Sequence, residues 1–130
     1  MFDTFFVNSP QGTAWPLGID AVDQHLQERF PGLRGWIRHA PVLGKDYLDF
    51  DVVLAGTQRS GAYYQGGPLI LNDGDAADWA PTIAWFLSLL PAGTPAVTMR
   101  ETNPDQIVLL PADPSAAQIQ QILEEMVAPG

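Results

Sequence analysis

Apolar residues recur every three to four positions in three segments of the chain, which is the period of an α-helix. The first segment follows Asp20, a residue suited to an N-cap, and stops at Pro31-Gly32. The last segment begins at Ser115, whose spacing from the glutamine three residues on is that of a capping box, and it runs to about Val127. The remaining segment lies between these two, in the middle of the chain, and begins after an Asn-Asp-Gly-Asp turn. The pattern therefore predicts three helices.

Between the helices, apolar and polar residues alternate with the period of a β-strand. The predicted strands are 33–40, 47–55, 60–65, 96–101 and 106–110, with 68–71 either extending the third strand or forming another. The resulting order is α-β-β-β-α-β-β-α, so we expect an α+β fold with an antiparallel sheet of about five strands flanked by three helices. We treat residues 1–130 as a single domain, in which 1–18 form an irregular N-terminal segment with a possible short strand at Phe2–Asn8.

The middle helix is apolar around most of its circumference. Between Trp79 and Leu90 only Thr82 and Ser88 offer clear polarity, whereas a surface helix normally keeps a polar side. Two interpretations follow: the helix is covered within its own subunit, or it contacts another chain. The two other helices and one small sheet offer too few residues to bury this helix on all sides, so the sequence favours an interface with another chain. The residues expected at this interface are Trp79, Ile83, Trp85, Phe86 and Leu89.

The composition is that of a packed globular protein, with 46% hydrophobic and 16% charged residues among 130. Cysteine is absent, which excludes disulfides, thiolate nucleophiles and thiolate metal sites. The net charge is −9 and is concentrated in residues 61–130, where Arg100 is the only base. Such a field repels nucleic acids and anionic membranes. The start of the chain, Met1–Val7, lacks the basic residues of a secretory signal, so we expect a cytoplasmic protein.

Candidate chemistry is limited to clustered carboxylates. Asp46, Asp49 and Asp51 lie on or beside one strand, where two of them share a face and could hold a divalent cation or act as acid and base. The simpler interpretation is a solvated strand face, with Arg38 of the preceding strand as a cross-strand partner. We therefore assign no catalytic, cofactor-binding or metal-binding residue and expect no cofactor. The same strand face offers an acidic binding surface for a basic partner, formed by Tyr47, Asp49, Asp51, Tyr63 and Tyr64.

The element order and the acidic charge resemble those of the type III secretion chaperones and their non-secretion relatives, over about residues 19–127. The resemblance implies a twisted antiparallel sheet, a dimer formed largely through the second helix, and an acidic surface that holds an unfolded effector segment. On this resemblance, Trp79, Ile83, Trp85, Phe86 and Leu89 correspond to the dimer helix. The proline-rich front segment and the four tryptophans depart from the family's pattern.

Three functional hypotheses follow. The first is a non-enzymatic protein-binding module, an acidic chaperone-like or adaptor homodimer with a protein partner. The second is an immunity or antitoxin-like inhibitor, in which Asp49, Asp51 and the tyrosines would plug the basic active site of a toxin. The third is a metal-dependent enzyme that uses Asp46, Asp49 and Asp51. The sequence favours the first.

Overall fold

The computed structural model of the chain describes residues 4–40 and 45–127. In chain order, its elements are β1 (Phe5–Asn8), α1 (Ile19–Arg29), β2 (Arg34–Ala40), β3 (Lys45–Leu54), β4 (Thr57–Tyr64), β5 (Leu69–Asn72), α2 (Ala76–Ser88), β6 (Val97–Arg100), β7 (Asn103–Leu109) and α3 (Ala116–Val127). None of the helices in this part of the chain is long and apolar enough to cross a bilayer.

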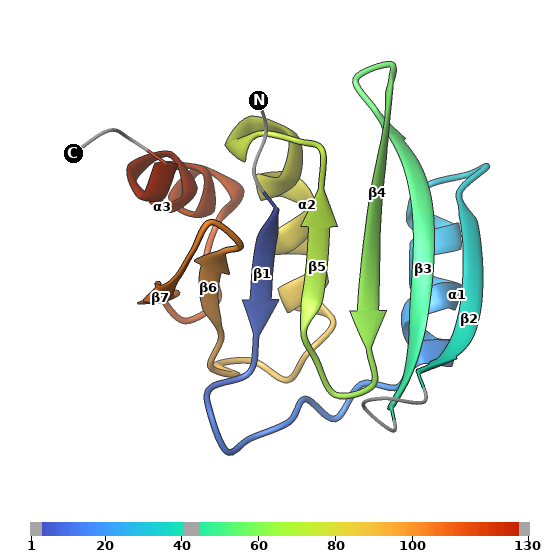
Figure 1. Ribbon diagram of the computed structural model, residues 1–130, viewed down its shortest axis with the longest axis horizontal. Helices are drawn as coiled ribbons and strands as arrows, with labels where there is room; N and C mark the ends of the chain where they lie inside the picture. The colour runs from blue at the N-terminus through green and yellow to red at the C-terminus, as the bar shows by residue number, and fades with distance from the viewer. Residues whose placement is uncertain (1–3, 41–44, 128–130) are drawn as a thin grey trace.

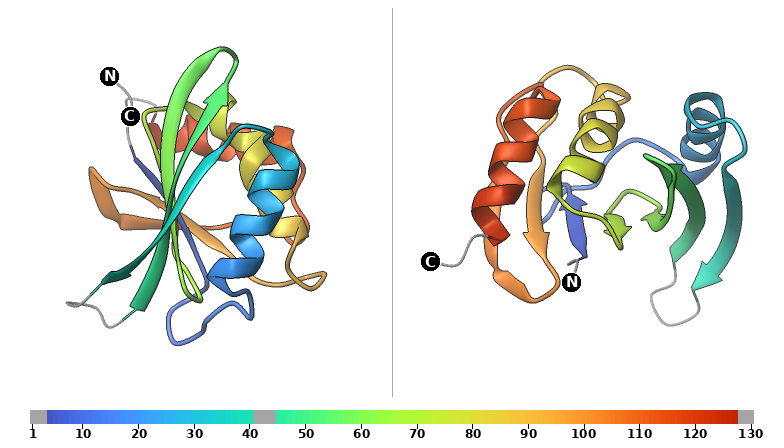
Figure 2. Two further views of the ribbon diagram at one scale, coloured as in Figure 1. Left: turned by 90° about the vertical axis from the view of Figure 1, so that its right-hand side faces the viewer. Right: turned by 90° about the horizontal axis from the view of Figure 1, so that it is seen from above.

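The strands form one antiparallel sheet in the order β2-β3-β4-β5-β1-β6-β7. Helices α1 and α2 lie behind the sheet in Figure 1, α1 behind β2 and β3 and α2 behind β1 and β5. Helix α3 packs against α2 at the end of the sheet that β6 and β7 form (Figures 1 and 2). The expected α+β class, the antiparallel sheet and the three helices are confirmed. The sheet has seven strands in the described residues, where about five were expected.

The largest correction concerns the N-terminal segment, which contributes a central strand. Strand β1 pairs with β5 on one side and with β6 on the other, so it joins the two halves of the sheet. Its alternate side chains Phe5 and Val7 are almost completely buried. A strand in this position must be apolar toward the helices, which the Phe-Phe-Val sequence provides. Phe2, where the predicted strand began, lies outside the described residues.

A second correction concerns the turn before β7. The predicted strands 96–101 and 106–110 leave the turn to the residues between them, centred on Asn103-Pro104-Asp105, but the chain turns at Glu101-Thr102 and β7 already begins at Asn103. Proline is compatible with this strand because β7 is at the edge of the sheet, where no further strand requires its missing amide.

The helix starts agree with the sequence in two of three cases. Asp75 is the N-cap of α2, and the Ser115 hydroxyl accepts a hydrogen bond from the backbone N–H of Gln118 at the start of α3. Helix α1 instead begins after Gly18, without a side-chain cap from that residue. The backbone N–H of Ile19 donates to Oε1 of Gln65 at 3.1 Å, so a residue from the β4–β5 turn takes the capping role expected of Asp20.

Helix α2 is covered from within the chain. Trp79, Ile83 and Phe86 are buried, and the ring of Phe86 lies 5.4 Å from those of Trp15 and Tyr63. The remaining sides of α2 are shielded by α3, which buries Ile119, Leu123 and Met126, and by the end of α1. Most of the apolar circumference of α2 is therefore hidden within the chain, whereas Trp85 and Leu89 stay partly exposed.

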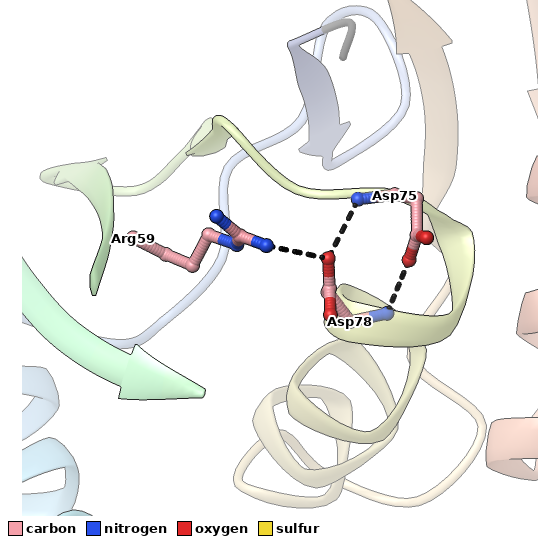
Figure 3. Close-up of polar contacts among 3 residues, drawn as sticks. All are labelled: Arg59, Asp75 and Asp78. Atoms are coloured by element: carbon pink, nitrogen blue, oxygen red, sulfur yellow. Dashed lines mark hydrogen bonds and ion pairs between the residues drawn. The ribbon is translucent and has the colours of Figure 1, made fainter. Parts of the chain in front are cut away.

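A salt bridge between Arg59 and Asp78 connects α2 to strand β4. Asp75 and Asp78 form a reciprocal capping box, in which each carboxylate accepts a hydrogen bond from the other residue's backbone N–H. Nη2 of Arg59 lies 3.2 Å from Oδ2 of Asp78, and both side chains are mostly buried (Figure 3). The hydrogen bond from the Asp75 backbone and the nearby Arg59 charge lower the pKa of the Asp78 carboxyl below its ordinary value of 3.8. The ionised form of Asp78 is thus the one that the fold stabilises.

This arrangement predicts a pH-dependent effect of the substitution Asp78→Asn. A carboxyl whose pKa is lower in the folded than in the unfolded state stabilises the fold above its unfolded pKa, and this contribution is lost as the pH falls through the folded pKa. We expect Asp78→Asn to reduce the free energy of unfolding by about 1 kcal/mol at neutral pH. The difference from the wild type should shrink below pH 4, as the wild-type carboxyl is protonated.

Urea unfolding at a series of pH values measures the free energy of unfolding of both proteins, with Asp105→Asn on the exposed surface of β7 as the charge-matched control. An Asp78→Asn deficit that is equal at all pH values would contradict this role.

Candidate functional site

The face of the sheet opposite α1 and α2, called here the open face, is the candidate functional surface. Among the described residues, no helix lies over it in Figure 2, where the β6–β7 hairpin and the lower ends of β2 and β3 project on that side. Side chains of a strand point alternately to the two faces, so the buried residues of each strand identify the helix side and their neighbours identify the open face.

Apolar side chains cross the open face in a row that spans four adjacent strands. Ile70 on β5 is opposite Ala62 on β4 and Phe6 on β1, and Phe6 is in turn opposite Met99 on β6. Phe6, Ile70 and Met99 are each partly exposed. Apolar residues directly opposite one another in neighbouring strands form a continuous surface. The middle of the open face is therefore apolar, although the helices cover only the other side.

This row lines a hollow of about 370 Å³. The lining residues are Phe6, Asn8, Tyr64, Gly67, Pro68, Ile70 and Met99. None of these described lining residues is charged, and the Oδ1 atom of Asn8 already accepts a hydrogen bond of 2.8 Å from the backbone N–H of Ser9. A hollow of this size and polarity is suited to apolar groups of a ligand rather than to an ion.

The apolar surface continues from the hollow to the edge of the sheet. Leu109 on β7 is opposite Val97 on β6, and its side chain is 67% exposed. Ile107, two residues earlier on β7, is 58% exposed. Of the six most exposed large apolar side chains in the described residues, strand alternation places four on the open face: Trp36, Val53, Ile107 and Leu109. Apolar groups concentrated on one face of a subunit are typical of an interaction surface.

The other half of the open face holds the expected acidic surface, and arginines compensate its charge. Asp49 Oδ2 lies 2.7 Å from Nε of Arg38, the cross-strand partner that the sequence predicts. Asp51 is directly opposite Arg34. The Arg38–Asp49 pair is largely exposed, so it contributes little to stability. This half of the face is polar but not strongly anionic.

Four of the five residues proposed for the acidic surface lie on the open face, and one does not. Tyr47 and Tyr64 stack with ring centroids 4.9 Å apart, on the same side as Asp49 and Asp51. Tyr63 points to the helix side, where it is buried and its hydroxyl donates to the carbonyl oxygen of Leu17 at 2.6 Å. Burial raises its pKa to about 12. Consecutive residues of a strand face opposite ways, so Tyr63 and Tyr64 could not both belong to one surface.

The residues expected at a dimer interface on α2 are not gathered on any surface. Trp79, Ile83 and Phe86 are buried within the chain. Trp85 and Leu89 are partly buried, Trp85 against the ring of Phe30. Sequence reasoning missed Phe6, Ile70 and Met99. For Phe6 and Ile70 the signal was that the short strands β1 and β5 are apolar on both faces, a pattern that indicates cover on both sides. Met99 carries no such signal, because β6 has Thr98 and Arg100 on its other face.

The structure offers no candidate metal centre in the residues that it describes. Within them, no three His, Asp or Glu side chains are placed to hold a metal ion together. The carboxylate of Asp49 is paired with Arg38, which competes with a cation for the same oxygen.

A scan against protein-family models, a search of curated proteins and a search of solved structures each gave no match. The resemblance to the type III secretion chaperones therefore stays a prediction from element order and charge. The function of this chain is therefore inferred from its open face alone.

Proposed function

We propose that the protein is a non-enzymatic protein-binding module and that the apolar half of its open face is the contact surface. The observation that carries the proposal is the row of Ile70, Phe6 and Met99 on the uncovered side of the sheet. Burying such side chains against a partner removes apolar area from water, at roughly 25 cal/mol per Å². Keeping them exposed without a partner would favour aggregation.

Two further features support binding over catalysis. The hollow is lined mainly by aromatic and aliphatic groups. Tyr64 is the one described lining residue with an acidic group, and no His, Asp, Glu, Lys or Arg stands beside it in the described lining to exchange its proton. The flanking strands carry exposed Ile107 and Leu109, which extend the same surface to the sheet edge. Together they resemble an interface with an apolar centre and a polar rim, in which Asp49, Arg38 and their neighbours form the rim.

The test is affinity capture from extracts of the native cells with matched baits. The wild-type protein should retain a protein partner, and Ile70→Lys should lose it, because the substitution places a charge in the middle of the apolar row. Ile37→Lys is the matched control: Ile37 is 44% exposed on the other face of β2, so the same change of side chain and charge leaves the open face intact. Circular dichroism of all baits checks that they are folded.

Met99→Lys provides a second disruption of the row, independent of strand β5, in case Ile70→Lys does not fold. A partner that all three folded variants retain equally would overturn the proposal. So would the absence of any partner that is bound in amounts comparable with the bait.

A further inference from the structure

We propose that the hollow on the open face is the seat of a single amphipathic helix with basic flanks, contributed by the partner protein. The inference rests on the proposed function and specifies the chemistry of the partner. It is argued from the width of the apolar row, from the hydrogen bonding of the strands beneath it, and from the charge of residues 61–130, which contribute five of its seven lining residues.

The backbone beneath the hollow excludes an extended peptide. Strands β5, β1 and β6 are hydrogen-bonded to one another, and the hollow lies over the middle of the sheet rather than at an edge. An extended peptide lying on this face would place its own N–H and C=O groups against apolar side chains without partners. A helix satisfies its backbone internally and presents only side chains.

The dimensions of the row fit one helix. The three strands that carry Ile70, Phe6 and Met99 span about 10 Å at a strand spacing of ~4.8 Å, which is close to the ~10 Å diameter of a helix with its side chains. Each of these strands has four residues, a length of about 13 Å at ~3.3 Å per residue. Two turns of helix cover that length and bring three large apolar side chains to one stripe.

The same dimensions argue against a second copy of the chain as the occupant. Even with β4 and β7 included, five strands make an apolar patch about 19 Å wide and 13 Å long, or roughly 250 Å². A stable protein interface buries about 800 Å² on each partner. The patch is too small to hold two sheets face to face, whereas it suffices as the apolar centre for one helix.

The acidic charge around the hollow indicates that the partner helix carries basic residues beside its apolar stripe. Strands β5, β6 and β7 belong to residues 61–130, which hold eight acids and one base, Arg100. Glu101 and Asp105 are exposed at the β6–β7 hairpin, beside the apolar surface of β6 and β7. A helix with lysine or arginine on either side of its apolar stripe would be attracted to this field, and an acidic one would be repelled.

A synthetic peptide tests the inference directly. The probe is a leucine–lysine peptide of about 15 residues with leucines at helical spacing. One control peptide has the same composition with the helical spacing scrambled, and another has glutamate in place of lysine.

Binding is measured by fluorescence anisotropy at low salt, and the contact surface is mapped by amide chemical-shift changes. We expect the scrambled and acidic peptides to bind the wild type at least about tenfold more weakly. We expect shifts centred on β5, β1 and β6 and a gain of helical circular dichroism.

The variants separate this inference from the proposed function. Ile70→Lys and Met99→Lys should each weaken peptide binding by about tenfold, and Ile37→Lys by less than about twofold. Equal binding of the scrambled peptide, or shifts mapped to another surface, would overturn the helical seat. If cellular capture depends on Ile70 while the basic helical peptide does not bind, the protein-binding function stands, and the inference that the partner binds through a basic helix is wrong. If neither capture nor peptide binding depends on Ile70, both proposals fail.

Discussion

Replacing Phe86 by alanine should lower the free energy of unfolding by about 3 to 5 kcal/mol, the range for truncating a fully buried phenylalanine. Phe86 is 1% exposed on the side of α2 that faces the sheet. Its ring contacts Trp15 from the loop before α1 and Tyr63 from β4, both at 5.4 Å between centroids. Alanine would remove the ring that connects these elements and leave a cavity that the sheet cannot close. Urea denaturation followed by tryptophan fluorescence and circular dichroism measures the loss.

Two further substitutions show whether the loss arises from the cavity. Phe86→Leu keeps most of the volume, so it should cost less than the alanine variant. Trp36→Ala removes a large side chain that is 42% exposed on the open face, so it should cost little stability. If Phe86→Ala cost no more than Trp36→Ala, α2 would not be packed as described, and the expectation that its apolar side meets another chain would regain its basis.

Gly61→Ala is the second substitution with a large expected effect, at about 2 to 3 kcal/mol. A β-carbon at Gly61 would lie 2.5 Å from Cζ of Phe50 and 2.7 Å from the backbone oxygen of Ile70. The phenyl ring has some freedom to move, but the carbonyl group belongs to β5 and moves only with that strand. Unfolding in urea measures the loss of stability.

Gly18→Ala is the matched control for Gly61→Ala. The added methyl group at Gly18 would meet only the side chain of Gln65, at 3.7 Å, which is ordinary contact. Because alanine is a poorer N-cap than glycine, the control should cost a few tenths of a kcal/mol, well below the Gly61 variant. Since Ile70 lines the hollow, Gly61→Ala should also weaken binding of the helical peptide. Equal stability of the two variants would contradict the close approach of β3, β4 and β5 at Gly61.

The long elements could be predicted from the sequence because their patterns are local. Helix α3 has its capping residue Ser115 and its apolar stripe within one short stretch, and β3 alternates over residues 47–54. Strands β1 and β5 have four residues each and are apolar on both faces, so they show no alternation. Residues 2–8 and 68–71 were therefore expected only as possible strands, and their central places in the sheet depend on pairing with distant segments, which no local pattern reports.

For a related reason, three of the five residues expected at an interface on α2, namely Trp79, Ile83 and Phe86, are buried within the chain instead. The apolar excess of the helix is real, but the sheet was expected to have about five strands, too few to cover it. The addition of β1 in the centre gives a wider sheet, and α3 covers part of the remaining surface. The acidic surface was predicted more closely, since Tyr47, Asp49 and Asp51 share a face as the alternation requires.

Because β1 lies in the centre of the sheet, the hollow on the open face can form only after distant segments of the chain have paired with β1. Its neighbours, residues 69–71 and 97–100, are synthesised long after it, so Phe6 has a strand on both sides only after residues 69–100 have left the ribosome. The hollow is complete only when segments from the beginning, the middle and the last third of the sequence have met. A copy in which these segments have not yet met lacks the hollow, so a partner that recognises the hollow would bind only the folded sheet.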